Sequence, residues 1–471
     1  MQAYAPLGAP AAGLPDRRLR PAPGGDDSDL QQQPSRSIPH KSGNRNAMDA
    51  TYAFFKNTPS PAPFPCLPPC LPDTLQHLRD CPRVLALQDT TDLNFSGLLD
   101  TPGLGQIDGP GGRGLKLHST LAVRADGLPA GLLTQQIWAR PPSHKGCAKD
   151  RRRRPAQDKE SFRWQDHAAQ ARAAVPADVT VVHIADREGD IYHWLAAPRP
   201  AQTHLLVRVA QGHRVVVHGP DDTPGTLAEV VRQAAVLGQH AITVPRADDQ
   251  PARQAVLTLR AAAMQIQPPH SAKQRRRLKP VPVWVLEAWE ENPPAGSEAV
   301  LWRLVSTEPI TSWEEGLRAL REYLLRWLIE RFHFVLKSGC QIEALQLADA
   351  DRLANAVAVY SQVAARVQRL TYLLRVQPEA AAEQEFSAEE REVLACSRAT
   401  RTRGRQNGAI QTVKEAVAEV ARLGGHLGRK GDGPPGLKVL WRGLECLHDR
   451  VLGFRLARKP LPFISEDTRN E

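Results

Sequence analysis

Two aspartates stand directly after apolar segments whose residue pattern predicts buried strands. Asp89 follows the run 83–88, and Asp186 follows the β-branched run 179–185. Both carboxylates are therefore expected at the edge of a sheet, where they would repel each other. A divalent cation removes this repulsion and prefers hard oxygen ligands. The pattern leaves open a simpler interpretation, in which each aspartate only begins a turn.

A long helix is expected from about Ser312, which has capping-box spacing to Glu315, to about Gly339. At about 100° per residue, one stripe of this helix carries four polar residues: Tyr323, Arg326, Glu330 and Lys337. A carboxylate there can hold a metal, arginine and lysine can bind phosphate oxygens, and tyrosine can donate a hydrogen bond to a DNA backbone. The alternative is a solvent-facing stripe with an ion pair between Arg326 and Glu330.

The elements that must position these residues change character along the chain. Apolar and β-branched segments predict strands at 83–88, 115–123, 131–138, 179–185 and 299–306, and less regular strands at 205–209, 214–217, 254–260 and 281–287. A helix is predicted at 158–173, and residues 341–456 are mostly helical in pattern. We therefore expect an α/β middle region followed by an all-helical end.

Composition narrows the class of protein. The chain has 471 residues and a net charge of +10, which predicts two to four domains and a polyanionic partner. Fourteen of the 40 prolines precede residue 73, so residues 1–36 are expected to be disordered. Seven scattered cysteines argue against a disulfide scaffold and favour a reducing cytosol. The sequence shows no signal-peptide pattern and no apolar run of about 18 residues, so no membrane association is expected.

Several segments, taken in order, resemble the DDE transposases of the insertion-sequence-four (IS4) family, of the Tn5 type. The run Tyr323 to Lys337 is similar to the family's Y-x2-R-x3-E-x6-K signature. The segments around Asp89 and Asp186 resemble its first and second aspartate motifs, and Leu301–Pro309 resembles the strand before its glutamate helix. The resemblance extends from about Ser37 to Ala457.

The resemblance implies an α/β, RNase H-like catalytic core with an inserted β-rich subdomain, followed by a helical dimerisation domain. The expected domains are a head at 1–36, the remnant of a DNA-binding arm with its linker at 37–72, a catalytic domain at 73–340 with an insertion at about 205–298, and a dimerisation domain at 341–471. It further implies a bacterial, cytoplasmic protein that joins the nucleoid when bound to DNA.

By the same resemblance, Asp89, Asp186 and Glu330 would be catalytic and would bind two Mg²⁺ ions, with Mn²⁺ as a substitute. The residues that would contact DNA are Tyr323, Arg326, Lys337, Trp302, Arg208 and His333. Trp302 matches the position that accepts a flipped base, although a tryptophan in a strand also suits core packing. The partners would be double-stranded DNA, as transposon ends and target, and a second copy of the chain in a synaptic complex.

Two basic runs add possible phosphate contacts, although each is also consistent with a solvated charged surface. One comprises Lys145, Lys149 and 151–154, and the other is 273–279. The first 36 residues do not match the DNA-binding arm of the family. Three functions therefore stay open: a cut-and-paste transposase, a non-autonomous copy that inhibits a full-length partner through mixed dimers, and a structure-specific nuclease.

Overall fold

The computed structural model describes residues 71–140, 159–244, 252–269, 278–429 and 431–458. These residues belong to two units, and the boundary between the units lies at Arg331 and Phe332. The first unit is mixed α/β with one large sheet, and the second is helical. This agrees with the expected order of an α/β region followed by a helical end. Of the helices in the described ranges, none combines the length and apolar character needed to cross a membrane.

Five strands form the part of the sheet that carries the candidate site. They are β1 (Arg83–Asn94), β3 (Arg113–Arg124), β4 (Pro129–Trp138), β5 (Thr180–Ala185) and β6 (Thr203–Arg208). Their spatial order is β4-β3-β1-β5-β6. β1, β3 and β4 pair antiparallel, whereas β5 runs parallel to β1 and β6 runs parallel to β5. Their apolar residues are buried on both faces, as expected for central strands.

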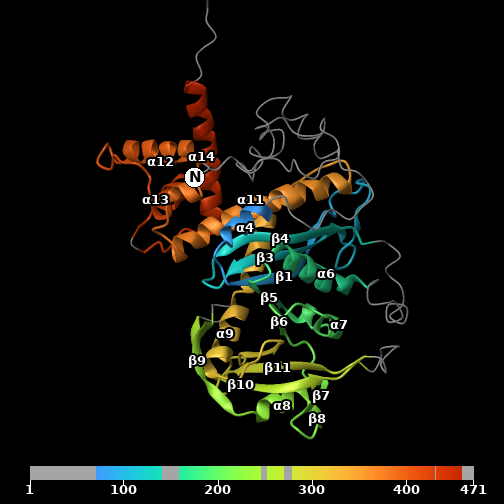
Figure 1. The fold of residues 1–471 in the computed structure, drawn as a ribbon. Coiled ribbons are helices and arrows are strands. Elements are labelled where there is room, and N and C mark those ends of the chain that lie inside the picture. The colour runs from blue at the N-terminus through green and yellow to red at the C-terminus, as the bar shows by residue number, and fades with distance from the viewer. Residues whose placement is uncertain (1–70, 141–158, 245–251, 270–277, 430, 459–471) are drawn as a thin grey trace, which may run out of the picture. The chain divides into compact units, whose positions relative to one another are not determined.

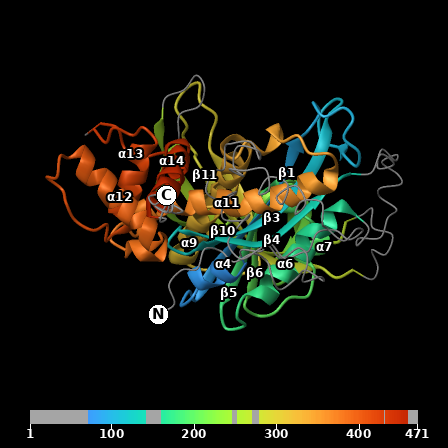
Figure 2. The same ribbon diagram turned by 90° about the horizontal axis from the view of Figure 1, so that it is seen from above.

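Two helices cover one face of these strands. α4 (Leu71–His77) contacts β4, and α6 (Arg163–Ala174) lies along β3 and β4 (Figure 2). Apolar residues after α4 and within α6 share one core with the strands, including Leu78, Val84, Leu133, Ala171 and Val181. A short helix, α7 (Tyr192–Leu195), follows β5 and adds Trp194 to a neighbouring core. Burial of this apolar surface is what holds the strands in register.

The remaining strands extend the same sheet. They are β2 (Gly105–Gln106), β7 (Val215–His218), β8 (Thr223–Thr226), β9 (Val236–Val244), β10 (Arg253–Ile266), β11 (Val281–Trp289) and β12 (Leu301–Ser306). β12 pairs with β6, and β11 and β10 continue outward from it, with α8 (Leu227–Gln233) packed against them (Figure 1). The expected insertion at about 205–298 overlaps the end of β6: residues 205–208 belong to β6, which pairs with β5, and the strands that follow in the chain begin at β7.

The helix expected from Ser312 to Gly339 is interrupted. α9 (Trp313–Leu324) begins at the predicted capping box of Ser312 and Glu315, but it ends at Leu324, and α10 (Trp327–Phe334) follows. Between them the backbone amides of Leu325 and Arg326 bond three residues back, which tightens the turn. A π-helical turn, Val335–Gly339, then replaces the last α-helical turn. The single stripe expected for Tyr323 to Lys337 therefore does not exist as a regular helical face.

The helical unit contains α11 (Ala350–Val376), α12 (Ala388–Arg401), α13 (Val413–Leu423) and α14 (Leu437–Arg458). Side chains cap three of them: Asp349 caps α11, and capping boxes at Ser387 and Thr412 begin α12 and α13. α11 is buried along most of its length. The glycine-rich segment 424–436 joins α13 to α14, as its composition predicts.

The contact between α13 and α14 depends on glycine. A Cβ atom added to Gly443 would lie 1.9 Å from the carbonyl oxygen of Val420, and one added to Gly424 would lie 1.9 Å from that of Val439. Both approaches are to backbone atoms, which cannot rotate away. The two helices therefore approach so closely that only glycine fits at these positions.

We expect Gly443→Ala to destabilise the helical unit by about 1–3 kcal/mol, because the helices must separate. Gly453→Ala is the matched control, since Gly453 lies on the same helix and the described part of the chain places no neighbouring atom within 4 Å of the added Cβ. This control should be neutral or should stabilise the helix by up to about 1 kcal/mol. Thermal unfolding followed by circular dichroism measures both. Equal effects of the two substitutions would contradict the close approach of α13 and α14.

Candidate active site

The two aspartates lie level with each other on neighbouring parallel strands. The register pairs Leu87 of β1 with Ile184 of β5, so two further residues along each strand bring Asp89 beside Asp186. Asp186 directly follows β5, as expected. The expectation that Asp89 follows its strand is wrong, because β1 continues to Asn94 and Asp89 pairs with Ser119 of β3. β1 runs on beyond the end of β5 and stays paired there with β3.

The electrostatic state of Asp89 shows how closely it is surrounded by carboxylates. Burial, followed by the charge of Asp186, raises the pKa of Asp89 to about 7. The charge of Glu330 raises this pKa further. The backbone amide of Thr90, which donates a hydrogen bond of 2.8 Å to Asp89 Oδ1, and the guanidinium of Arg326 act in the opposite direction. The charges of Asp186 and Glu330 therefore both act on Asp89 through space.

Arg326 and Glu330 form an ion pair beside the aspartates. Arg326 lies in the turn between α9 and α10, and one of its terminal nitrogens is 2.5 Å from Glu330 Oε1. Both side chains are half-buried. The ion pair between Arg326 and Glu330, which the sequence pattern left as the alternative to a metal site, is thus present. It lies near Asp89 rather than on a separate solvent-facing stripe. The positive charge of Arg326 lowers the pKa of Asp89 and so partly offsets the repulsion from the neighbouring carboxylates.

Three other predicted DNA-contact residues gather around Arg326. Tyr323 is buried, with its ring centroid 6.4 Å from that of Trp302 on β12 and the Arg326 guanidinium 6.0 Å from its ring. Burial raises the pKa of Tyr323, and the charges of Arg326 and Arg208 partly offset this rise. Arg208 ends β6, and the register between β5 and β6 brings it level with Asp186. The structure thus brings Trp302, Tyr323, Arg326 and Arg208 together.

Lys337 and His333 belong to the helical unit. Lys337 lies in the π-helical turn after α10. His333 is buried, and burial, with a smaller contribution from the charge of Lys337, lowers its pKa to about 3. His333 is therefore neutral at pH 7 and has little surface available for a DNA contact, whereas the expectation for Lys337 stays a prediction.

The fit of these residues to a metal is partial. Across the described parts of the chain, no group of three or more histidine, cysteine, aspartate or glutamate side chains is arranged to hold a metal ion. Glu330 is bound to Arg326 instead. The carboxylate chemistry does suit Mg²⁺, because the like charges that raise the pKa of Asp89 are those that a divalent cation would neutralise. Arg326 contacts Glu330 through Oε1, and the second carboxylate oxygen of Glu330 has the chemistry to bind a cation.

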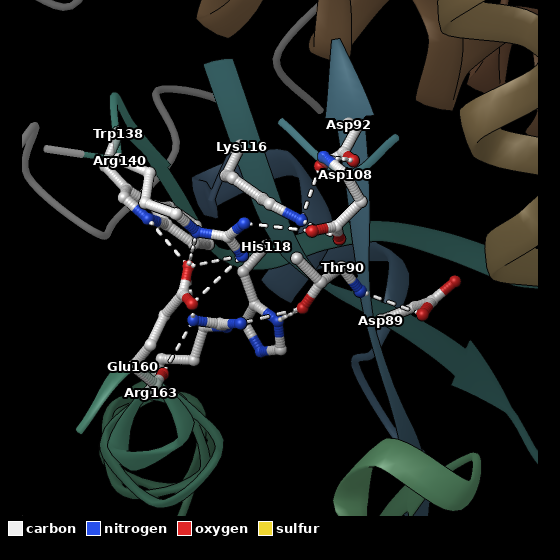
Figure 3. Close-up of polar contacts among 10 residues, drawn as sticks. All are labelled: Asp89, Thr90, Asp92, Asp108, Lys116, His118, Trp138, Arg140, Glu160 and Arg163. Atoms are coloured by element: carbon white, nitrogen blue, oxygen red, sulfur yellow. Dashed lines mark hydrogen bonds and ion pairs between the residues drawn. The ribbon is translucent and has the colours of Figure 1, made fainter. Parts of the chain in front are cut away.

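A polar network beside Asp89 was not anticipated from the sequence (Figure 3). Next to Asp89 along β1, Thr90 Oγ1 lies 2.8 Å from His118 Nδ1 of β3. His118 Nε2 is 3.2 Å from Gln88, whose amide lies 3.2 Å from the buried His183 of β5. The signal for this network was the presence of polar residues at interior positions of apolar strands. These contacts connect β3, β1 and β5 near the point where the pairing between β1 and β5 ends.

Three cations extend the same network. Lys116 of β3, Arg140 after β4 and Arg163 at the start of α6 converge near Thr90 (Figure 3). Each is paired with carboxylates: Asp92 and Asp108 hold Lys116, while Glu160 holds both arginines. The basic run at 145–154 and most of the run at 273–279 lie outside the described residues.

Comparison with known families bears on the helical unit. Residues 362–461 match the family model of the Tn5 transposase dimerisation domain. The match supports a Tn5-type transposase. It covers the second half of α11 and all of α12, α13 and α14. The match supports dimerisation through this segment and suggests a DNA-processing enzyme.

Proposed function

We propose that the protein is a DDE transposase of the IS4 family that performs metal-dependent cut-and-paste transposition. The observation that carries the proposal is the placement of Asp89 level with Asp186 on adjacent parallel strands, with Glu330 close enough to raise the pKa of Asp89. The strand order β4-β3-β1-β5-β6, with three antiparallel strands followed by two parallel ones, supports an RNase H-like core. The match to the Tn5 dimerisation domain supports the same conclusion independently.

In this proposal Asp89, Asp186 and Glu330 would hold two Mg²⁺ ions. The bound ions would supply Lewis-acid stabilisation of charge on the attacking and leaving oxygens of a phosphodiester. Arg326 and Arg208 would bind the phosphate oxygens, since both guanidinium groups already lie beside Tyr323 at the acidic edge. Trp302, which is half-buried and 6.4 Å from the Tyr323 ring, would offer an aromatic face to an unstacked base.

The test uses the full chain and linear DNA that carries the terminal repeats of its own element. With Mg²⁺ or Mn²⁺ we expect nicking at the repeat ends, hairpin formation and release of the flanking DNA, and with EDTA we expect no products. Pre-cut ends mixed with a target plasmid should give strand-transfer products. If neither metal supports cleavage, the proposal is wrong. Cleavage without transfer of pre-cut ends would favour the nuclease, and a chain that only suppresses a full-length relative would favour the inhibitor.

A further inference from the structure

The carboxylates that pair with Lys116, Arg140 and Arg163 differ in how exposed they are to solvent. Lys116 Nζ lies 2.5 Å from Asp108 Oδ2, and Asp108 Oδ1 lies 2.9 Å from an Arg140 terminal nitrogen. One carboxylate therefore bridges two cations, which is how a phosphate group bridges lysine and arginine side chains. The exposure is opposite on the two sides: the Lys116 and Arg140 side chains are 6% and 20% exposed, whereas that of Asp108 is 70% exposed.

Because of this difference in exposure, the Asp108 carboxylate can move away, whereas the Lys116 and Arg140 side chains are held in place. Ion pairs of a largely exposed carboxylate contribute little stability, because water replaces them at small cost. Lys116 is held from the strand side by Asp92 at 2.6 Å, and Arg140 is held by Glu160 at 3.0 Å. If Asp108 turned outward, Lys116 and Arg140 would keep their positions. With Arg163, which shares Glu160, three cations would then be paired with two carboxylates, leaving one excess positive charge.

The segment that carries Asp108 leaves room for an approaching ligand. Asp108 lies in the turn between β2 and β3, followed by Gly109 and Gly111, which have φ angles of +95° and +71°. A Cβ atom added at either glycine would lie more than 4 Å from every atom of the described residues other than its chain neighbours, so this turn faces open space among them. The backbone amide of Asp108 donates a 2.9 Å hydrogen bond to Asp92 Oδ2. The turn is therefore held by its backbone, independently of the Asp108 carboxylate.

The cluster is also within electrostatic reach of the candidate active site. Arg163 Nε lies 3.4 Å from Thr90 Oγ1, and Thr90 follows Asp89 on β1. The charges of Arg163 and Lys116 both act to lower the pKa of Glu188, although burial and then Asp186 leave that pKa raised overall. An anion bound by these cations would thus lie beside the pair of carboxylates formed by Asp89 and Asp186.

We propose that Lys116 and Arg140 form a binding site for a DNA backbone phosphate, and that the Asp108 carboxylate occupies this site until DNA displaces it. The inference rests on the DNA-binding function proposed above and assigns one further phosphate contact to it. Asp108 then weakens DNA binding in the free protein, because each binding event must replace an existing pair of ionic contacts.

The test compares two charge-removing substitutions in the full chain. Asp108→Asn keeps the shape and the backbone bond to Asp92 but removes the competing charge. Asp126→Asn is the matched control, since Asp126 also pairs with an arginine, Arg124, and lies in the turn at the opposite end of β3. Binding of a fluorescent 20-base-pair duplex is measured by anisotropy without divalent metal, over a range of salt concentrations.

We expect Asp108→Asn to strengthen duplex binding about three- to tenfold near 0.1 M salt and to steepen the salt dependence by up to about one phosphate equivalent. Adding Arg140→Gln to Asp108→Asn should remove the gain, with unfolding temperatures confirming that both proteins are folded. Asp126→Asn should change affinity less than twofold. If the chain binds duplex but Asp108→Asn and Asp126→Asn behave alike, the phosphate site is wrong and the proposed function stands. If the chain binds no duplex at any salt concentration, both fail.

Discussion

Glu330→Gln is expected to reduce DNA cleavage by roughly 10³-fold or more, the scale seen when one member of a cooperating catalytic set is removed. Gln keeps the size of the side chain and a hydrogen-bond acceptor for Arg326, so the local fold should persist. The glutamine side chain lacks the negative charge that raises the pKa of Asp89 and that would bind a divalent cation. The measurement is the rate of nicking at the terminal repeat in Mg²⁺ and in Mn²⁺.

Glu314→Gln is the matched control for this loss. Glu314 is an exposed glutamate in the first turn of α9, the helix that precedes the turn at Arg326. It should cleave at close to the wild-type rate. Gel filtration should give the same oligomeric state for both variants and the wild type, because the matched dimerisation segment is unchanged. Wild-type cleavage by Glu330→Gln would remove Glu330 from the proposed site.

Asp89→Asn is expected to stabilise the metal-free protein, and to do so increasingly as the pH rises. The folded pKa of about 7 lies above the ordinary value of 3.8, so between these pH values the folded state retains a proton that the unfolded state has released. Rising pH therefore favours unfolding across this window, and the penalty is complete above pH 7. A shift of about three units corresponds to at most about 4 kcal/mol. Asn removes the charge and hence the penalty.

The unfolding temperature of the α/β unit, measured in EDTA at pH 5 and pH 8.5, tests this directly. The gain from Asp89→Asn should be small at pH 5 and larger at pH 8.5. An exposed aspartate of the same unit, Asp100, gives the control: Asp100→Asn should change the unfolding temperature equally little at both pH values. Added Mg²⁺ should raise the unfolding temperature of the wild type more than that of Asp89→Asn. Destabilisation by Asp89→Asn at pH 8.5 would contradict the repulsion among the carboxylates.

Local features of the fold could be predicted from the sequence because neighbouring residues determine them. The β-branched run before Asp186 forms β5, and Ser312 with Glu315 forms the capping box that begins α9. The helical end likewise follows from its periodicity. The error at Asp89 has the same origin: the polar residues after Gln88 ended the apolar signal, but β3 supplies a pairing partner that keeps the backbone extended to Asn94.

The break between α9 and α10 could not be predicted in this way. The residues around Leu325 and Arg326 include no glycine or proline and are ordinary helix formers, so their local preference favours a continuous helix. In the structure Leu328 and Ile329 are buried beyond the break, and Arg326 reaches both Glu330 and the surroundings of Asp89. Tertiary contacts therefore selected the tighter turn over the regular helix.

The sequence by itself determined that Asp186 directly follows a strand, that Glu330 lies in a helix and that Asp89 comes next after an apolar strand segment. Only the tertiary structure decided that β1 and β5 are parallel neighbours in a register that brings the two aspartates level, and that Glu330 is held by Arg326. It also decided that Lys116 and Arg140 share the carboxylate of Asp108. The reason is that strand pairing and charge pairing join residues far apart in the chain, and only the packing of the whole unit brings them together.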